Sequence, residues 1–338
     1  LCVGDGGCHR SFSESVHPLV KAVLEQSGRL VWSETADPEP GPGEVILQAR
    51  ASAVNRADLV QRSGNYPPPP GASPILGLEC SGTVVALGPG VPAEALGQQR
   101  CALLAGGGYA EKVAVPWSHT LPLPSGVDLL RAAALPEVLA TAWLNLRLEG
   151  QLQPGERVLI HAGASGVGTA ALQLCRAWGN PTFVTVGSEA KLERCKELGA
   201  AAGWVRHQGD WLEAVRAWGG ADVVLCPVGA AYLNSNLQAL HSRGRLGLAG
   251  LMGGREAALP LGLVLVKRLS LRGSVLRSRS RQEKDFILEG LQREVWPLVE
   301  SGEVQPIIDS VLPIQQAEEA HDRLASNETV GKIILEFV

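Results

Sequence analysis

A glycine-rich turn joins a short apolar run to a helical apolar pattern in LIHAGASGVGTAALQL, residues 159–174. Gly163, Gly166 and Gly168 leave the backbone bare, so a ligand or a neighbouring backbone segment can approach it closely. A helix that begins at such a turn presents free N–H groups and the positive end of its dipole, which suits a pyrophosphate. The spacing is G-x-x-G-x-G rather than the common G-x-G-x-x-G, and tight packing without a ligand remains an alternative.

Two other strand-to-helix motifs do not fit this turn. A hydrolase elbow, G-x-S-x-G, would need a glycine where this chain has Val167. A P-loop would need Gly-Lys-Ser or Gly-Lys-Thr at the end of the turn, and the sequence has neither there. A dinucleotide site is therefore the prediction, provided that the turn lies in a strand-helix-strand unit.

The pattern around the turn supplies that context, because residues 133–281 alternate between apolar runs and helical segments. This alternation predicts an α/β fold with a doubly wound parallel sheet. The predicted strands are RVLIHAG, PTFVTVG, ADVVLCPVG and GRLGLAGL. Residues 20–131 instead show short alternating runs broken by turn residues, which predicts a β-rich barrel or sandwich. Near the end we expect one amphipathic helix over 282–304 and a closing strand in 331–338.

The length of 338 residues exceeds the usual size of one hydrophobic core, so we expect two domains. The first 18 residues lack periodicity and are predicted to be a disordered or non-native leader. The predicted boundaries are 19–136 for the β-rich catalytic domain, 137–282 for the cofactor domain, and 283–338 for a return to the first domain.

Composition excludes several classes of protein. A net charge of −4 and a pI near 6.0 argue against a general nucleic-acid binder. The basic cluster in 277–281 is either an anion site or a solvated loop. Eight residues is the longest apolar stretch, too short to cross a membrane. The seven cysteines include no C-x-x-C, which argues against structural zinc and favours reduced thiols in a cytoplasmic protein.

Cofactor choice depends on the end of the second strand of the parallel sheet, where binders of NAD carry an acid. This chain has Gly187 and Ser188 there, followed by Lys191, with Arg206 after the next strand. A hydroxyl and two cations suit a 2′-phosphate, so NADPH is the predicted cofactor. Two alternatives stay open: Glu189 binds the ribose, or the two cations are only solvated helix-surface charges.

The chain resembles the quinone oxidoreductases of the medium-chain dehydrogenase/reductase superfamily, and most closely their tumour-suppressor-inducible branch. The resemblance runs from about residue 20 to the end of the chain and rests on NRADLVQRSGNYPPPPGAS, ILGLE, HAGASGVGTAALQL, ELGAAAG, GLMGG, LRSRS and GKIILE. It implies a GroES-like catalytic domain, a Rossmann domain and a homodimer joined through edge strands. Zinc-dependent relatives carry a Cys and a His where this chain has Asn55 and Leu78, so the resemblance implies no metal.

The same resemblance implies a reaction in which hydride passes from NADPH to a quinone. The implied cofactor residues, with those predicted above, are Ser165, Gly166, Val167, Gly168, Ser188, Lys191, Arg206, Leu251, Met252, Leu276, Arg277 and Asn327. The implied catalytic residues are Tyr66, Asn55 and Thr141, with Tyr66 and Asn55 donating to the quinone oxygens. The remaining alternatives for function are an enone or enoyl reductase, or a non-catalytic structural or RNA-binding protein.

Each implied role has a structural alternative. Tyr66 precedes four prolines and can pack on them. Asn55 and Asp58 can cap a helix, which we favour for Asp58. Thr141 can bond to its own backbone. Lys332 either approaches the cofactor or is a surface charge. Two departures from relatives also affect the site: Pro227 alters a loop beside the nicotinamide, and Tyr109 is expected to narrow the substrate entrance.

Overall fold

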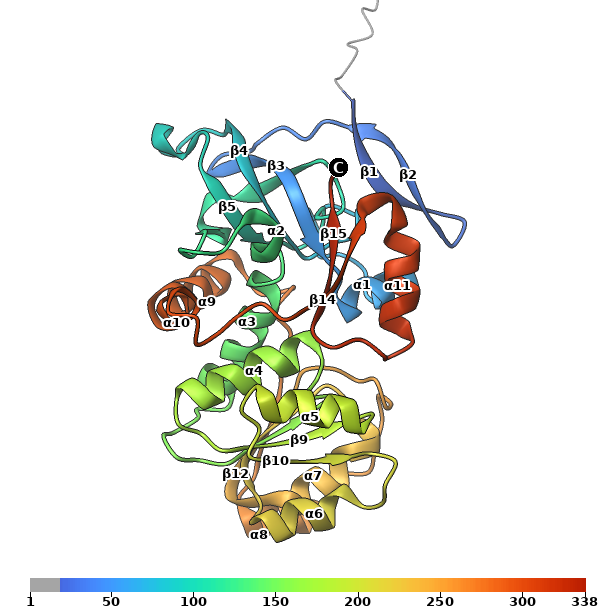
Figure 1. Ribbon diagram of the computed structural model, residues 1–338, viewed down its shortest axis with the longest axis vertical. Helices are drawn as coiled ribbons and strands as arrows, with labels where there is room; N and C mark the ends of the chain where they lie inside the picture. Colours follow the sequence, from blue (N-terminus) through green and yellow to red (C-terminus); the bar gives the residue numbers. More distant parts are fainter. Residues whose placement is uncertain (1–18) are drawn as a thin grey trace, which may run out of the picture.

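Two large sheets and a separate hairpin organise residues 19–338, which the computed structural model describes (Figure 1). The predicted leader, residues 1–18, lies outside the described residues. The hairpin pairs β1 (Leu19–Gln26) with β2 (Arg29–Ala36). Its two turn residues, Ser27 and Gly28, have φ of 53° and 83°, as a two-residue hairpin turn requires.

The first sheet has seven strands in the order β14-β15-β3-β4-β5-β7, with β6 paired to β3. Its strands are β3 (Glu44–Ala53), β4 (Glu79–Leu87), β5 (Gln99–Leu103), β6 (Lys112–Pro116), β7 (Thr120–Pro122), β14 (Ile308–Pro313) and β15 (Lys332–Glu336). The last strand, β15, runs antiparallel to β3, with Ile334 opposite Ala53. The end of the chain therefore lies beside residues that precede it by about 280 positions.

The second sheet is parallel throughout, in the order β10-β9-β8-β11-β12-β13. Its strands are β8 (Val158–His161), β9 (Thr182–Val186), β10 (Ala202–Val205), β11 (Ala221–Cys226), β12 (Leu240–Leu248) and β13 (Ser270–Gly273). Numbered in chain order, the strands lie in the order 3-2-1-4-5-6. Successive strands are therefore added first on one side of β8 and then, from β11 onward, on its other side. The predicted doubly wound α/β fold is confirmed; β10 was only implied, as the strand before Arg206, and β13 was not predicted.

Helices cover both faces of the second sheet because alternate side chains of its strands point to opposite faces. Val158 and Ile160 pack with α4 (Gly166–Ala177) and α5 (Glu189–Glu197). Leu159 packs on the other face with α6 (Trp211–Trp218) and α7 (Leu233–Ala239). The helix α8 (Leu261–Lys267) lies on that same face, next to β12.

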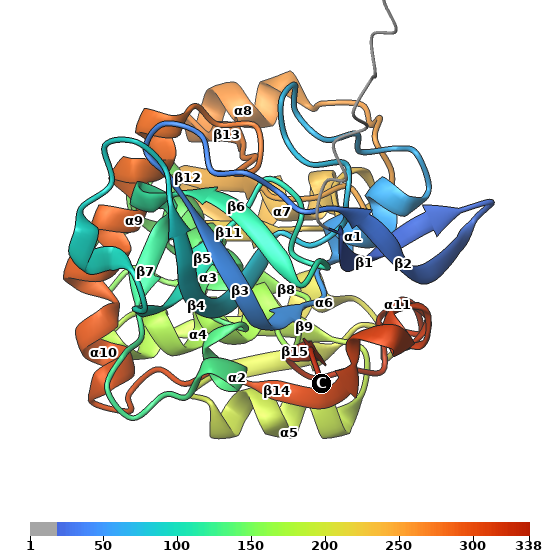
Figure 2. The same ribbon diagram turned by 90° about the horizontal axis from the view of Figure 1, so that it is seen from above.

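The remaining helices contact the first sheet or the helices beside it, and those of residues 281–300 and 317–325 lie on opposite sides of the molecule seen from above (Figure 2). They are α1 (Arg56–Arg62), α2 (Leu129–Ala132), α3 (Pro136–Trp143), α9 (Arg281–Glu294), α10 (Trp296–Glu300) and α11 (Ala317–Ala325). Short 3-10 helices are η1 (Ala93–Ala95), η2 (Trp117–His119), η4 (Ala230–Tyr232) and η5 (Ile314–Gln316), and α3 continues as a π-helix, η3 (Leu144–Glu149). The prediction of a single helix over 282–304 is wrong. The helix is interrupted at Val295, between α9 and α10, because Pro297 has no N–H to continue the hydrogen bonding of α9.

Candidate functional site

The glycine-rich turn leads from the carboxyl end of β8 directly into α4. Ser165 caps this helix: its Oγ accepts from the Gly168 N–H at 3.1 Å and its carbonyl accepts from the Thr169 N–H at 2.8 Å. The first N–H groups of a helix have no intrahelical partner, which leaves those of Gly166 and Val167 for a ligand. Because β8 borders the point where the strand order reverses, this helix end faces the place where doubly wound sheets bind ligands.

Tight packing also accounts for two glycines of the turn. A Cβ atom at Gly168 would lie 2.4 Å from the Ala162 carbonyl oxygen, and one at Gly166 would lie 2.6 Å from Cδ of Lys332. The close approach is therefore to the chain's own atoms. The glycine spacing is therefore explained by packing within the chain. The feature that suits an anion is the pair of free N–H groups at the start of α4.

Polar side chains meet where β9 and β10 end, beside that turn. Ser188 caps α5, and the Lys191 Nζ donates to the Asn327 carbonyl at 2.6 Å. The guanidinium of Arg206 lies 3.9 Å from the position that a Cβ of Gly187 would take. Burial and the nearby Arg206 charge lower the pKa of Lys191. The Lys191 ammonium has lost part of its solvation and lies near a second positive charge, Arg206. An anion bound between the two side chains would stabilise both charges.

Glu189, the alternative ribose acid, lies in the same region. Its Oε1 accepts a hydrogen bond from the Gln208 side chain at 2.7 Å. Glu189 is exposed at the first turn of α5, where a carboxylate also complements the helix dipole.

A buried ion pair lies beneath the turn. Lys332 Nζ is 2.8 Å from Glu79 Oε1, and both side chains are almost completely buried. Lys332 also donates to the Val54 carbonyl and to Asn55 Oδ1 at 2.6 Å. The reading of Lys332 as a surface charge is wrong, because β15 carries it into the interior.

Asn55 belongs to the same buried network, so its predicted role changes. Its two side-chain N–H groups donate to the Ala53 carbonyl at 3.2 Å and to Glu79 Oε1 at 3.0 Å. Because both N–H groups already have acceptors within the protein, the prediction that Asn55 donates to a quinone oxygen is corrected. Asn55 instead holds Lys332 and Glu79 in place.

Asp58 caps α1, as favoured from the sequence. Its carboxylate accepts from the backbone N–H groups of Asn55 at 2.8 Å and Gly77 at 3.2 Å, and from the Tyr109 hydroxyl at 3.2 Å. Burial raises the pKa of Asp58 to about 6, although these hydrogen bonds act in the opposite direction. Tyr109 is completely buried and also contacts His321 Nε2 at 3.1 Å. The expectation that Tyr109 narrows a substrate entrance is therefore wrong.

Thr141 has a side-chain partner rather than its own backbone. Its hydroxyl lies 3.0 Å from Glu137 Oε1, one turn earlier in α3. The Glu137 N–H donates to Glu79 Oε2 at 2.9 Å, which connects this pair to the buried ion pair. Burial raises the pKa of Glu137 to about 7, because the nearby Lys332 charge only partly offsets the loss of solvation.

Arg277 braces the segment that carries Tyr66. Its guanidinium donates to the carbonyls of Ala105 and Tyr66 and to the Gln61 side chain, and it lies 5.1 Å from the centre of the Tyr66 ring. Arg277 is 5% exposed, so it belongs neither to a solvated loop nor to an open anion site. Its predicted cofactor contact is corrected to a positioning role. In the described part of the chain, the Tyr66 hydroxyl forms no hydrogen bond and is free to donate.

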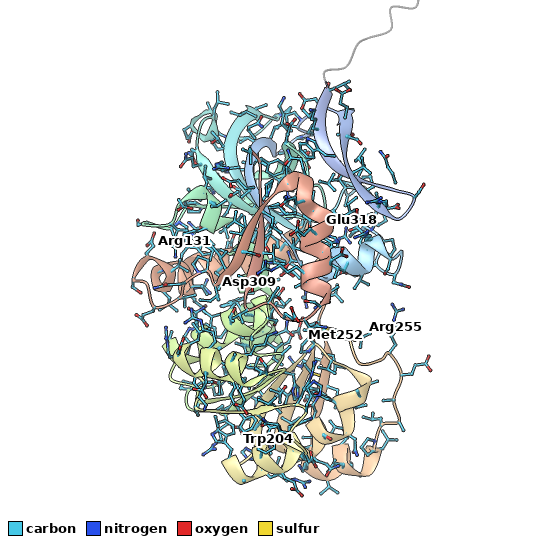
Figure 3. All side chains as sticks on the ribbon, turned by 45° about the vertical axis from the view of Figure 1, so that its right-hand side comes forward. Arg131, Trp204, Met252, Arg255, Asp309 and Glu318 are labelled. Atoms are coloured by element: carbon cyan, nitrogen blue, oxygen red, sulfur yellow. The ribbon has the colours of Figure 1, made fainter. Side chains whose placement is uncertain are left out.

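The other predicted cofactor residues differ in exposure. Leu276 is buried next to Arg277, whereas Leu251 and Met252 are half exposed. Met252 follows β12, at the level where the two sheets approach each other (Figure 3). Its N–H donates to the Pro227 carbonyl at 3.2 Å, so the loop that contains Pro227 supports the loop of Leu251 and Met252.

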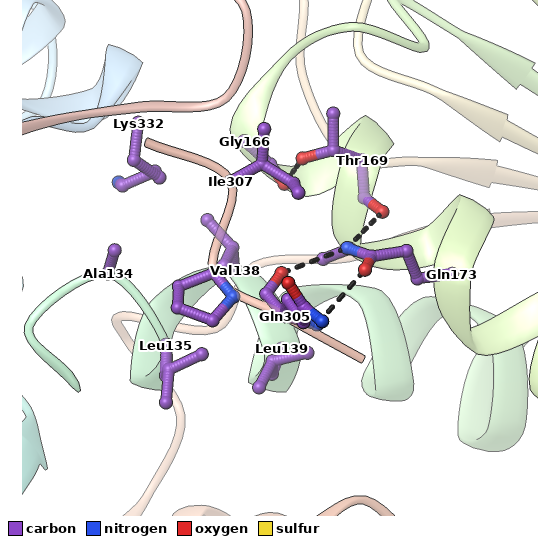
Figure 4. Close-up of a pocket in the computed structure, with 12 residues that line it drawn as sticks. Ala134, Leu135, Val138, Leu139, Gly166, Thr169, Gln173, Gln305, Ile307 and Lys332 are labelled. Atoms are coloured by element: carbon purple, nitrogen blue, oxygen red, sulfur yellow. Dashed lines mark hydrogen bonds between the residues drawn. The ribbon is translucent and has the colours of Figure 1, made fainter. Parts of the chain in front are cut away.

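The seam between α3 and α4 is closed. A cavity of about 10 Å³ lies there, lined by side chains that include Val138, Thr169 and Lys332 (Figure 4). This is space for about one water molecule. The side chain of Gln173 exchanges two hydrogen bonds of 3.0 Å with the backbone of Gln305, which ties α4 to the segment before β14. The cofactor would therefore bind outside this seam.

Residues 19–338 show neither a metal-ligand cluster nor a membrane-spanning helix. Within that range no three His, Cys, Asp or Glu side chains come together as a metal site, and no helix has both the length and the hydropathy to cross a membrane. The cysteines described by the structure are free and buried: Cys80, Cys101, Cys175, Cys195 and Cys226.

Sequence reasoning missed Glu79, Glu137 and His321 as members of the site. A signal existed for Glu79, which begins a buried strand in GLECSG, where a charged side chain needs a partner. The partner, Lys332, lies 253 positions later, so the pairing is visible only in three dimensions.

Family models match both halves of the chain. Residues 41–125 match the alcohol dehydrogenase GroES-like domain, and residues 166–289 match the zinc-binding dehydrogenase domain. The human synaptic vesicle membrane protein VAT-1 homolog is 31% identical over 316 residues, which are 89% of this chain and 80% of that protein.

Two solved structures show the same fold. The quinone oxidoreductase from Thermus thermophilus, solved also in complex with NADPH, has a TM-score of 0.81 and 30% identity, covering 95% of this chain and 100% of its own. The mycobacterial protein Rv1454c, solved in complex with NADPH, has a TM-score of 0.83 and 28% identity, covering 94% of this chain and 100% of its own.

Proposed function

This chain belongs to the medium-chain dehydrogenase/reductase superfamily, and from that membership we propose that it is a zinc-independent, NADPH-dependent reductase of quinones. The observation that carries the proposal is that two anion-binding features lie side by side. One is the set of free N–H groups at the start of α4, and the other is the cation pair Lys191 and Arg206 at the neighbouring strand ends. One group suits a pyrophosphate and the other a 2′-phosphate. We assign the chain, within the superfamily, to the tumour-suppressor-inducible type of quinone oxidoreductase.

The residues present fit NADPH. The first turn of α4 offers two backbone donors, and the buried Asn145 Oδ1 has no hydrogen-bond partner in the described residues and is available to a donor. Bound NADPH would supply hydride. The protein would hold the phosphates at Gly166, Val167, Lys191 and Arg206, and Tyr66 would donate its free hydroxyl to a substrate oxygen.

The residues at the two zinc-ligand positions favour chemistry without a Lewis acid. Asn55 binds Lys332 and Glu79, and Leu78 has no ligand atom. Quinones are electron-poor and need little polarisation, so positioning and hydrogen-bond donors suffice for them.

The first test is NADPH oxidation by the purified chain with 1,2-naphthoquinone. We expect turnover that survives a chelator and is slower with NADH, because the two cations discriminate through the 2′-phosphate. Parallel reactions with an enone separate the second acceptor class. Tight NADPH binding without turnover of either acceptor would contradict the proposed activity and favour a non-catalytic role.

We propose in addition that two copies of the chain associate through the outer edge of the second sheet. Within residues 19–338, the strand β13 is paired only with β12, and α8 beside it exposes Leu261, Leu265 and Val266 by 69%, 77% and 79%. An unpaired strand edge next to exposed apolar side chains suits continuation of the sheet into a second copy.

A charge on this surface is expected to prevent that association. Leu265→Asp should convert a dimer into a monomer in sedimentation velocity, because a carboxylate would have to be buried without a partner. Phe286→Asp, at a residue that is 53% exposed on α9, is the control and should leave the mass unchanged. A wild-type monomer at all concentrations would contradict the dimer.

A further inference from the structure

The helix α3 is buried except at two positions. Its other side chains lie in the core, while Glu137 and Thr141 keep partial exposure. These residues are four apart, so they occupy the same face of the helix, one turn above the other. A helix that is otherwise surrounded by protein therefore presents one carboxyl and one hydroxyl to an open side.

The geometry around Glu137 fixes both groups. Glu137 Oε1 is 3.0 Å from the Thr141 hydroxyl, while its backbone N–H is bound by Glu79. Thr141 is held in turn from the next turn, because the Asn145 side chain donates to its carbonyl at 2.8 Å. Asn145 belongs to the π-helix η3, a distortion that frequently accompanies functional sites.

The charged groups that face Glu137 come from several elements. Lys332 on β15 favours its ionised form, whereas Glu79 on β4 and Asp58 on α1 oppose it. Lys332 is in direct contact with Glu79 rather than with Glu137. The Lys332 ammonium is thus the nearby cation for all three carboxyl groups, but it forms its ion pair with Glu79. Burial raises the pKa of Tyr66, the Arg277 charge lowers it, and the Glu137 charge raises it, which places the proposed substrate donor within electrostatic reach of Glu137.

The protonation state of Glu137 decides what Thr141 can do. An ionised carboxylate only accepts, so the Thr141 proton must point at it and the hydroxyl can only accept from the open side. A protonated Glu137 can donate to the Thr141 oxygen, which turns the Thr141 O–H outward. With the pKa raised to about 7, both forms exist at neutral pH.

We propose that Glu137 and Thr141 form a proton relay, in which Thr141 passes a proton to the substrate oxygen and Glu137 restores it. This inference rests on the proposed reductase function, and it assigns Thr141 as the catalytic residue and Glu137 as the positioning residue and proton reservoir.

The relay balances the reduction of a quinone or enone carbonyl. The electron pair arrives as hydride from the bound cofactor and leaves the substrate oxygen anionic. The Thr141 O–H bond breaks as a new O–H bond forms at the substrate oxygen, and the Glu137 proton moves to the Thr141 Oγ. Glu137 ends as a carboxylate and takes up a proton from solvent before the next turnover.

The test compares Glu137→Gln, Thr141→Val and Thr141→Ser with the wild-type chain. With 1,2-naphthoquinone or an enone, the wild-type kcat should fall as pH rises through about 7, because the protonated form is the active one. Glu137→Gln and Thr141→Val should lower kcat about 100-fold, and Glu137→Gln should also lose the pH dependence. Thr141→Ser should recover most of the activity, because it keeps the hydroxyl.

A readout without turnover accompanies the kinetics. Infrared titration of the ligand-free wild-type chain should show carboxylic acid bands that disappear near pH 6, from Asp58, and near pH 7, from Glu137, and only the band that disappears near pH 7 should be missing in Glu137→Gln. Wild-type turnover with an unchanged pH profile in Glu137→Gln, or no such band in the wild type, would overturn the relay alone. No wild-type turnover with either acceptor would overturn the proposed function and the relay with it.

Discussion

Replacing Lys332 by methionine is expected to lower the free energy of unfolding by about 3–5 kcal/mol, the usual cost of leaving one member of a buried ion pair without its partner. Lys332 is 4% exposed and Glu79 is fully buried, so water cannot compensate for the lost charge. Methionine keeps the length of the aliphatic stem, which passes beside Gly166. Chemical denaturation, followed by circular dichroism, measures the change.

The pH dependence of this loss has a definite sign. Lys332 lowers the pKa of both Asp58 and Glu137, so removing it raises these pKa values further above those of the unfolded chain. When an acid has a higher pKa in the folded protein than in the unfolded chain, the folded protein loses stability as pH rises, because the unfolded chain releases the proton first. The deficit of the variant should therefore be larger at about pH 8 than at about pH 5.

Two further variants separate the ion pair from general damage. Adding Glu79→Gln to Lys332→Met should recover part of the lost stability, since the uncompensated carboxylate is then removed. Lys196→Met, at an exposed lysine paired with Glu193, should change stability little. If Lys332→Met cost no more than Lys196→Met, the buried ion pair would not stabilise the fold.

The arrangement of the second sheet was predictable because its signals are local. Apolar runs, capping residues such as Ser165 and Ser188, and short connections all act over fewer than twenty positions. The misses have local causes too. In β13, the sequence SLRG is short and weakly apolar, and a break at Val295 before Pro297 ended α9 earlier than the continuous amphipathic pattern suggested.

The site was less predictable, because its contacts join distant parts of the chain. Lys332 meets Glu79, and Tyr109 meets His321, across more than 200 positions. A sequence reveals which residues have useful chemistry, but not which hydrogen-bonding groups are already used inside the protein. Asn55 and Arg277 illustrate this limit, because internal acceptors take both side-chain N–H groups of Asn55 and three of the five guanidinium N–H groups of Arg277.

Replacing both Lys191 and Arg206 by alanine is expected to reduce the preference for NADPH over NADH roughly 1,000-fold. Each charge-assisted hydrogen bond to a phosphate contributes about 1.5–3 kcal/mol, and loss of about 4 kcal/mol in total corresponds to that factor. The change should appear as a higher KM for NADPH, while the KM for NADH stays nearly constant. The two Kd values, measured by titration of cofactor fluorescence, provide the same comparison without turnover.

The reason for expecting a selective effect is the arrangement around Asn327. Asn327 has a φ of 59°, so it lies in a left-handed turn. Lys191 donates to its carbonyl, and Arg56 donates to its side chain at 2.7 Å. This second contact keeps the turn in place when Lys191 is lost, so the substitution removes charge from the phosphate region without opening it. Lys196→Ala on the same helix is the matched control and should leave both cofactors unaffected. An unaltered NADPH preference in the double variant would mean that the 2′-phosphate binds elsewhere, and the proposed pairing of α4 with these two cations would have to be abandoned.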